Sequence, residues 1–270
     1  MIAPRCKVLV ALLVAAVSAP AAAAGAPAVP GAPVVIAAPH YGAVLFDFYL
    51  DRPFDALGDL MVSQHFDRLG GHRDEAELLR GGLLLDAGAP RAAAAIFTQL
   101  IDGGAPASIR DRAWFLLARS QHERGDGDAA AAAIARIGAP LAGGLEDERQ
   151  LLAARLLSER GDDAGAARLL AAAAEVHPAN ALLRYNLALA WLRSAGTASG
   201  EGPVARALAL LEAIGSAPAE DDEEARALRD RANLALGTVA LRLHEPERAR
   251  AALQRVRLHG DRADAALLAA

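Results

Sequence analysis

The chain is poor in two chemically versatile residues, cysteine and lysine. It has one cysteine, Cys6, and one lysine, Lys7, and both precede an apolar run near the N-terminus. If this segment is removed on export, the mature chain has no thiol. It then forms no disulfide and has no cysteine nucleophile or thiolate metal ligand. Because no cysteine directly follows the apolar run, we expect a soluble form and not a lipoprotein.

Catalytic and metal-binding motifs are also missing. None of the seven histidines forms an H-x3-H or H-E-x-x-H pair, and there is no G-x-S-x-G elbow, phosphate loop or dinucleotide fingerprint. His65 and His72 flank a turn with Asp67 and Asp74 nearby, which could in principle bind a metal. We interpret them as ordinary surface histidines. The sequence therefore predicts no enzyme activity, no metal and no cofactor.

An excess of positive charge is absent as well. The whole chain has 28 basic and 33 acidic residues, and without Arg5 and Lys7 the balance is 26 against 33, a net charge of −7. Binding to nucleic acid depends on a basic surface that neutralises phosphates. The composition therefore argues against a nucleic-acid partner.

The N-terminus has the three-part layout of a secretory signal peptide. Arg5 and Lys7 form a short basic region, the apolar run extends from Val8 to Val17, and Ala22 to Ala24 supply an A-x-A cleavage pattern. The run is shorter than the roughly 20 apolar residues that a helix needs to cross a bilayer. We expect a signal peptide at residues 1–24 and export to the periplasm of a Gram-negative bacterium, with an uncleaved anchor as the alternative.

Residues 25–39 (GAPAVPGAPVVIAAP) are rich in proline and alanine and carry no charge. Such a composition predicts an extended tether and not a packed element. We therefore place the folded part of the chain at residues 40–260.

Self-similarity organises that folded part. Five segments superimpose, and a degenerate first copy begins at Tyr41; each has an apolar stretch of helical length, a short turn and an Ala-rich second stretch. A small residue recurs in the first helix at Val44, Gly81, Ala118, Ala154, Ala188 and Gly237, with first steps of 37, 37, 36 and 34 residues. The turn residue recurs at Asp51, Gly88, Gly125, Gly161, Gly202 and His244.

The second helix repeats two further positions. A small residue lies at Ala56, Ala93, Ala130, Ala166, Ala207 and Ala249, and a large apolar residue follows four positions later at Leu60, Phe97, Ile134, Leu170, Leu211 and Leu253. Small residues at these places allow the paired helices to approach closely, and the large residues are expected to fill the gaps between them. Stability then comes from stacking of neighbouring repeats.

These residues resemble the tetratricopeptide repeat family, whose repeat is about 34 residues long. Trp114-x2-Leu117-Ala118 matches the family's W-x2-L-G opening with Ala for Gly, Asn186 to Trp191 (NLALAW) is similar to its N-L-A/G-x-A-Y variant, and Pro178 stands where the closing proline belongs. The resemblance implies an all-α fold, an α-solenoid in which helix-turn-helix repeats form a right-handed superhelix. About six repeats are expected, at residues 37–70, 74–107, 111–144, 147–180, 181–217 (with an insertion) and 230–260, followed by a short or truncated capping helix at 261–270.

Two segments depart from the repeat. An insertion lies within residues 194–202, and an acidic stretch from Glu220 to Glu224 delays the sixth repeat. We expect both to be loops at helix ends, either solvated connectors or an acidic contact patch.

The resemblance also implies a binding face. In that family the first helices line a concave groove, and positions two, five, nine, twelve and thirteen of each repeat point into it. Here those positions hold Arg112, Phe115, Arg119, His122, Arg155, Ser158, Tyr185, Leu189, Arg193, Arg231, Thr238 and Arg242. An Arg-rich groove with aromatic and aliphatic patches suits an extended peptide with carboxylates. Alternatively, these arginines only solvate a helix face and pair with Glu123, Glu148 and Glu159.

The expected function is a non-enzymatic scaffold of the cell envelope that binds a protein or peptide in this groove. The lysine-and-asparagine clamp that some relatives use for C-terminal carboxylates is missing, because only Asn186 matches in type, and we do not predict a receptor for chaperone tails. A second hypothesis is a regulatory or accessory subunit of an envelope enzyme or export complex, or a truncated member of a longer repeat protein. It draws on the short helical pattern from Asp264 to Ala270.

Overall fold

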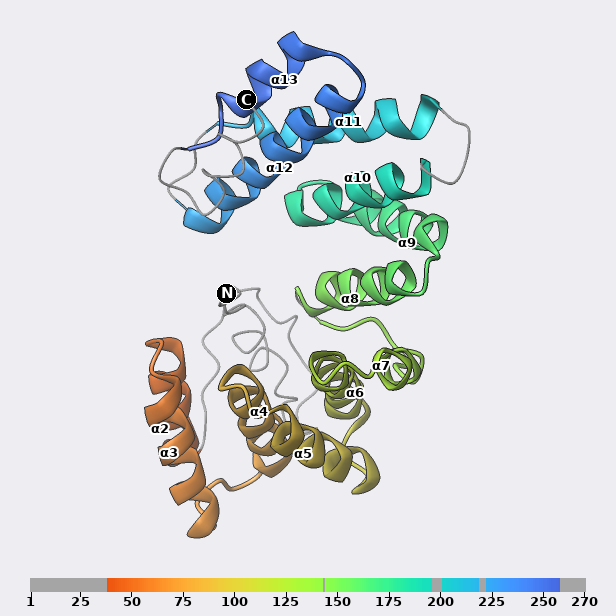
Figure 1. Cartoon of the computed structure of the whole chain (residues 1–270). Coiled ribbons are helices and arrows are strands. Elements are labelled where there is room, and N and C mark those ends of the chain that lie inside the picture. The colour runs from red at the N-terminus through yellow and green to blue at the C-terminus, as the bar shows by residue number, and fades with distance from the viewer. Residues whose placement is uncertain (1–37, 143, 196–200, 219–221, 258–270) are drawn as a thin grey trace, which may run out of the picture. The chain divides into compact units, whose positions relative to one another are not determined.

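The computed structural model describes residues 38–142, 144–195, 201–218 and 222–257, and the regular structure within these ranges is entirely helical (Figure 1). The chain divides into two compact units, Met1–Arg149 and Gln150–Ala270, which we describe one at a time. The predicted signal peptide, nearly all of the predicted tether, the centre of the insertion and the predicted capping helix lie outside the described residues. The handedness of the superhelix stays a prediction.

The first unit consists of three helix pairs and the start of a fourth. The pairs are α2 (Pro39–Tyr49) with α3 (Pro53–His65), α4 (Arg73–Asp86) with α5 (Pro90–Asp102), and α6 (Ala107–Glu123) with α7 (Gly127–Ile134). Each helix packs on its partner, α3 contacts α4, α5 contacts α6, and the first helices α4 and α6 also touch. This is the packing of a helical repeat, with contacts between neighbours in the sequence.

The second unit continues the same order. Its helices are α8 (Leu145–Glu159), which crosses the boundary between the units, α9 (Asp163–Val176), α10 (Ala181–Ala195), α11 (Glu201–Gly215), α12 (Glu223–Arg242) and α13 (Pro246–Leu253). Helix α10 packs on α9 and α11, α12 packs on α11 and α13, and the first helices α10 and α12 are in contact.

Local sequence explains where the helices begin. Proline stands in the first turn of α2, α3, α5 and α13, where its missing N–H costs nothing. Three other helices begin after an aspartate whose carboxylate accepts from backbone N–H groups of the first turn, namely Asp126, Asp162 and Asp222.

The predicted turn column is confirmed at five of six positions. Backbone φ is positive at Asp51 (61°), Gly88 (79°), Gly125 (81°), Gly161 (82°) and His244 (60°). At each, the following residue donates its N–H to the carbonyl five residues earlier, as Ala89 does to Leu84 at 2.8 Å. This Schellman geometry satisfies carbonyls at the helix end. Gly202 was assigned wrongly, because it lies inside α11; the insertion has moved the connection to residues before Glu201.

The small and large columns form the core of each helix pair. All twelve small residues are buried, and so are five of the six large ones, Ile134 at the end of the short α7 being half-buried. A Cβ added at Gly81 would overlap the ring of Phe97, and one at Gly237 would lie 2.6 Å from Leu253 Cγ. The large residue of the second helix therefore occupies the space that the small residue of the first helix leaves free.

The structure corrects the prediction that the acidic stretch from Glu220 to Glu224 is a loop. Asp222 caps α12, with its carboxylate accepting from the N–H groups of Glu224 and Ala225, and Glu223 and Glu224 belong to the first helical turn. Negative side chains at a helix N-terminus complement its dipole. The C-terminal part of the predicted loop is therefore a helix start.

Candidate protein-interaction surface on the first helices

In the first unit, the first helices bring an aromatic and charged cluster together. The rings of Tyr41 and His72 stack, with centroids 5.0 Å apart and planes at 20°. Burial raises the pKa of the Tyr41 hydroxyl far above its ordinary value, and the negative charge of Glu75 raises it further. Burial lowers the pKa of the Arg112 guanidinium, and the same Glu75 charge acts in the opposite direction. The cluster thus joins α2, the start of α4 and α6.

Two of the predicted groove residues lie inside this unit and not on its surface. The exposed fraction is 4% for Arg112 and 1% for Phe115. The family resemblance places both at inward positions, but Arg112 lies close enough to Glu75 and Tyr41 for their charges to act on it. The expectation that these two side chains line an open groove is therefore corrected, because both are buried within the first unit.

Farther along α6, the predicted residues are partly accessible. The Arg119 guanidinium lies 3.9 Å from the Asp86 carboxylate at the end of α4, and both side chains are largely covered. Burial raises the pKa of the neighbouring Glu123 carboxyl, and the positive charge of Arg119 opposes that shift. His122 is half-buried. The positive charge of Arg119 is therefore already engaged within the protein.

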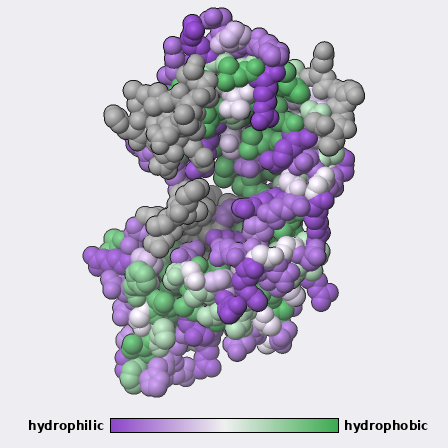
Figure 2. Space-filling model, in the orientation of Figure 1, coloured by the Kyte–Doolittle hydropathy of each residue, from purple (hydrophilic) through white to green (hydrophobic). Residues whose placement is uncertain are grey.

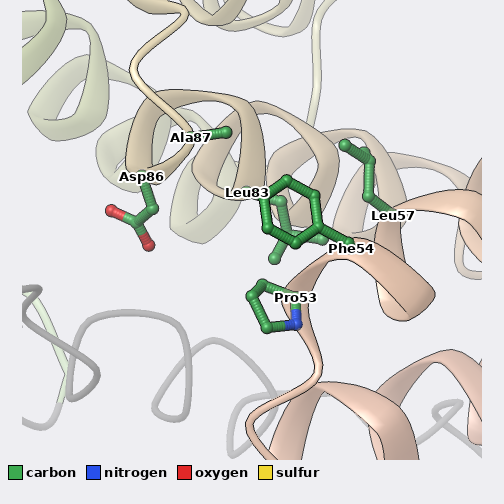
Figure 3. Close-up of a pocket in the computed structure, with 6 residues that line it drawn as sticks. All are labelled: Pro53, Phe54, Leu57, Leu83, Asp86 and Ala87. Carbon is green, nitrogen blue, oxygen red and sulfur yellow. The ribbon is translucent and has the colours of Figure 1, made fainter.

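An apolar pocket opens beside this ion pair, where the first and second helix pairs meet. It is lined by Pro53, Phe54, Leu57, Leu83, Asp86 and Ala87 (Figure 3). In Figure 3 the ring of Phe54 lies over Leu83, and Asp86 stands apart at one end of the pocket. The pocket can hold an apolar side chain close to one carboxylate.

In the second unit, the predicted residues of α8 and α10 meet on the surface. Arg193 donates from Nε to Asp163 Oδ1 at 2.9 Å and from Nη2 to Ser158 Oγ at 3.4 Å. Arg155 donates from Nε to Glu159 Oε1 at 3.0 Å, and both side chains are exposed. We call six of the predicted inward positions of α8, α10 and α12 the first-helix surface, namely Arg155, Ser158, Tyr185, Leu189, Arg193 and Arg242.

The arginines of the first-helix surface are more accessible to solvent than Arg112 in the first unit. Arg155, Arg193 and Arg242 are exposed, while Tyr185 and Leu189 are half-buried beside them. Of the internal pairs expected under the alternative interpretation, the one between Arg155 and Glu159 is present. An exposed ion pair contributes only about 0–1 kcal/mol. The Arg155–Glu159 pair therefore contributes little to the stability of the fold.

A repeated aspartate is a structural feature that the sequence interpretation missed. Asp111 Oδ1 accepts from the backbone N–H of Gly138 at 3.2 Å, and Asp230 Oδ1 accepts from that of Arg257 at 3.3 Å, in both cases 27 residues later. Asp230 also accepts from Arg257 Nε at 2.7 Å. Aspartate occurs at the equivalent position of four repeats, as Asp74, Asp111, Asp147 and Asp230, and this spacing was the signal that could have found it.

The histidines considered as metal ligands have other neighbours. His72 stacks on Tyr41, and His65 meets Phe66 edge to face, with centroids 4.9 Å apart. Within the described ranges, no group of three or more His, Cys, Asp or Glu side chains could hold a metal ion. Nor does any helix of that part of the chain have the length and apolarity needed to cross a membrane.

Paired helices, positive-φ turns and small-against-large packing define the tetratricopeptide-repeat fold. Comparison with solved structures agrees: the C-terminal part of a TPR repeat-containing protein from Cytophaga hutchinsonii matches with a TM-score of 0.56 at 11% identity, over 84% of this chain and 86% of that chain. At this identity the likeness establishes the fold alone.

Two further structures match more weakly and carry no argument. They are Naa15/Naa10 bound to HypK-THB (17% identity, 86% of this chain and 32% of that chain, TM-score 0.40) and the TPR2AB domain of yeast Sti1 in a complex with pHSP90 (13% identity, 86% and 95%, TM-score 0.33). No family model and no curated protein matches the chain.

Proposed function

We propose that this chain is a non-enzymatic protein-interaction scaffold of the cell envelope, exported by the signal sequence predicted at residues 1–24. Its ligand is an extended peptide or protein segment with carboxylate side chains. The first-helix surface of the second unit binds it. The observation that carries this proposal is the presence of three exposed arginines on the first helices of an acidic protein.

The chemistry of the surface supports this ligand class. A guanidinium group can donate two parallel hydrogen bonds to a carboxylate, and such pairs are stronger than neutral hydrogen bonds. Arg155 and Arg193 are already oriented by Glu159, Asp163 and Ser158, so less side-chain freedom is lost on binding. Tyr185 and Leu189 add apolar area between the charges. The arginines then select the ligand and the apolar residues add affinity.

A defined peptide tests the proposal. The probe is a fluorescein-labelled peptide of alternating Glu and Tyr, compared with its Gln–Tyr analogue by fluorescence anisotropy at physiological salt. We expect the Glu peptide to bind at least tenfold more tightly than the Gln peptide. The combined change Arg155→Gln, Arg193→Gln and Arg242→Gln is expected to remove that preference.

The matched control removes three arginines from second helices. Arg168→Gln on α9 with Arg248→Gln and Arg250→Gln on α13 makes the same change of net charge away from the first-helix surface. We expect the control to bind as the wild type does and both variants to keep the wild-type far-ultraviolet circular dichroism. Equal loss of binding in the two variants would show that net charge alone attracts the peptide, and the proposed surface would be wrong.

A further inference from the structure

The first helix pair exposes an unusual amount of apolar surface. Among the described residues, seven of the eleven large apolar side chains that are exposed lie on α2, on α3 or directly after them. They are Phe46, Tyr49, Leu50, Phe54, Met61, Val62 and Phe66, which we call the α2–α3 apolar face. Figure 2 shows hydrophobic residues gathered over these two helices. Exposed apolar side chains that are concentrated on one part of a soluble protein indicate a candidate interaction site.

Both helices are apolar on two sides. On α2, Val44 and Leu45 are buried in the pair while Phe46 and Tyr49 are exposed. On α3, Ala56 and Leu60 are buried, whereas Phe54, Met61 and Val62 share an exposed stripe with spacings of seven and eight residues. A helix that is apolar on two sides normally packs on two sides. The outer stripes are therefore suited to a second packing partner.

The shape of the face suits a helix. Gly58 lies within the α3 stripe, four residues after Phe54 and three before Met61, and a Cβ built on it would meet no atom within 4 Å. A glycine between large exposed side chains leaves a depression that can receive a side chain from a facing helix. Phe54, 72% exposed, also lines the pocket of Figure 3, so the stripe continues into that pocket.

The charges around the face are negative. Residues 46–68 contain five aspartates and two arginines. The guanidinium of Arg52 lies 3.7 Å from the Asp47 carboxylate, and that of Arg68 lies over the Phe66 ring at 4.7 Å. Asp55 and Asp59 are exposed on α3, one turn apart. Their carboxylates border the apolar stripe on the helix that carries Phe54 and Met61.

We propose that the α2–α3 apolar face binds an amphipathic helix of a partner protein that carries arginine or lysine along the borders of its apolar side. Apolar residues of the partner fill the stripe and the pocket, and its cations meet Asp55 and Asp59. A second copy of this chain would bring the same aspartates together, and an anionic membrane would repel them. This site is separate from the first-helix surface and selects the opposite charge.

Two designed helices test the face. The probes are fluorescein-labelled amphipathic peptides, one of Leu and Lys and the other of Leu and Glu, and anisotropy measures their binding to the intact chain. We expect the Leu–Lys helix to bind and the Leu–Glu helix not to bind. Phe54→Ser with Met61→Ser is expected to weaken binding at least tenfold, because both side chains are exposed and their loss leaves the core intact.

Each variant has a matched control. For the Phe54→Ser, Met61→Ser variant, the control is Val176→Ser with Leu243→Ser, which removes exposed apolar side chains elsewhere. A second variant, Asp55→Asn with Asp59→Asn, removes the acidic border of the face, and its control is Glu175→Gln with Glu247→Gln. The aspartate variant is expected to weaken binding about tenfold and to reduce its salt dependence, whereas both controls bind as the wild type does. Full binding by the Phe54→Ser, Met61→Ser variant, or equal effects of the controls, would overturn the proposal.

The two alternative occupants of the face, a second copy of this chain and an anionic membrane, are tested directly. Sedimentation velocity of the chain measures self-association, and flotation with phosphatidylglycerol vesicles measures membrane binding. We expect a monomer that does not float. A dimer that dissociates on the Phe54→Ser, Met61→Ser change would assign the face to a second copy, and flotation lost on that change would assign it to lipid; either result overturns the proposal. Binding of the Glu–Tyr peptide to the first-helix surface is unaffected in every case.

Discussion

At the scale of single residues, the fold depends on pairs of unequal size. Gly81 faces Phe97 and Gly237 faces Leu253, each small residue on a first helix and each large one on the second helix of the same pair. The sequence was sufficient to predict these columns, because the sizes recur at a fixed spacing. It assigned Phe97 to the large column, and Phe97 is buried. It made no prediction for Phe54, an aromatic residue outside the columns that is exposed.

Two glycine-to-alanine changes distinguish the effect of close packing on stability from the effect of helix propensity. Alanine at Gly81 would overlap the Phe97 ring, and we expect a cost of about 1–3 kcal/mol in the free energy of unfolding. Alanine at Gly58 meets no atom, and its better helix propensity should stabilise the protein by about 0.5–1 kcal/mol. Urea unfolding followed by circular dichroism measures both. Equal effects of the two changes would contradict the small-against-large packing.

At the scale of the helices and turns, the connection after the first helix is the most regular feature. Glycine occupies the positive-φ position in three pairs, and Asp51 and His244 occupy it in two others. The sequence predicted these turns because one residue must reverse the chain after a helix of fixed length. It failed at Gly202 because the insertion adds residues there, so the same column falls inside α11.

The strain at His244 can be measured. A non-glycine residue in the left-handed region costs roughly 1–2 kcal/mol. We therefore expect His244→Gly, at φ 60°, to raise the free energy of unfolding by about 0.5–1 kcal/mol after the added chain entropy of glycine. His177→Gly is the control, because His177 follows α9 with φ −124° and carries no such strain. That change should be destabilising. Thermal unfolding of the two variants distinguishes them, and stabilisation by both would contradict the assignment of strain.

At the scale of the whole molecule, the sequence predicted the repeat but only part of the binding face. The family resemblance placed Arg112, Arg155 and Arg193 at inward positions of their repeats. Accessibility depends on neighbours from other repeats, which no periodicity reveals: Arg112 lies near Glu75 and Tyr41 and is buried, whereas Arg155 and Arg193 have exposed partners. The exposed face of α2 and α3 was missed because apolar residues in a helical pattern indicate a core.

The central claim is that a protein partner binds along the first helices of the array. Site-specific photo-crosslinking tests it most directly, with a photoreactive amino acid at Ser158 on α8 or Thr238 on α12, and at Arg168 on α9 or Arg250 on α13 as second-helix controls. Mass spectrometry of adducts formed in the envelope of the producing cell identifies the partner. We predict that the same protein is captured from both first-helix positions and from neither second-helix position. Capture from the second-helix positions alone would contradict the account.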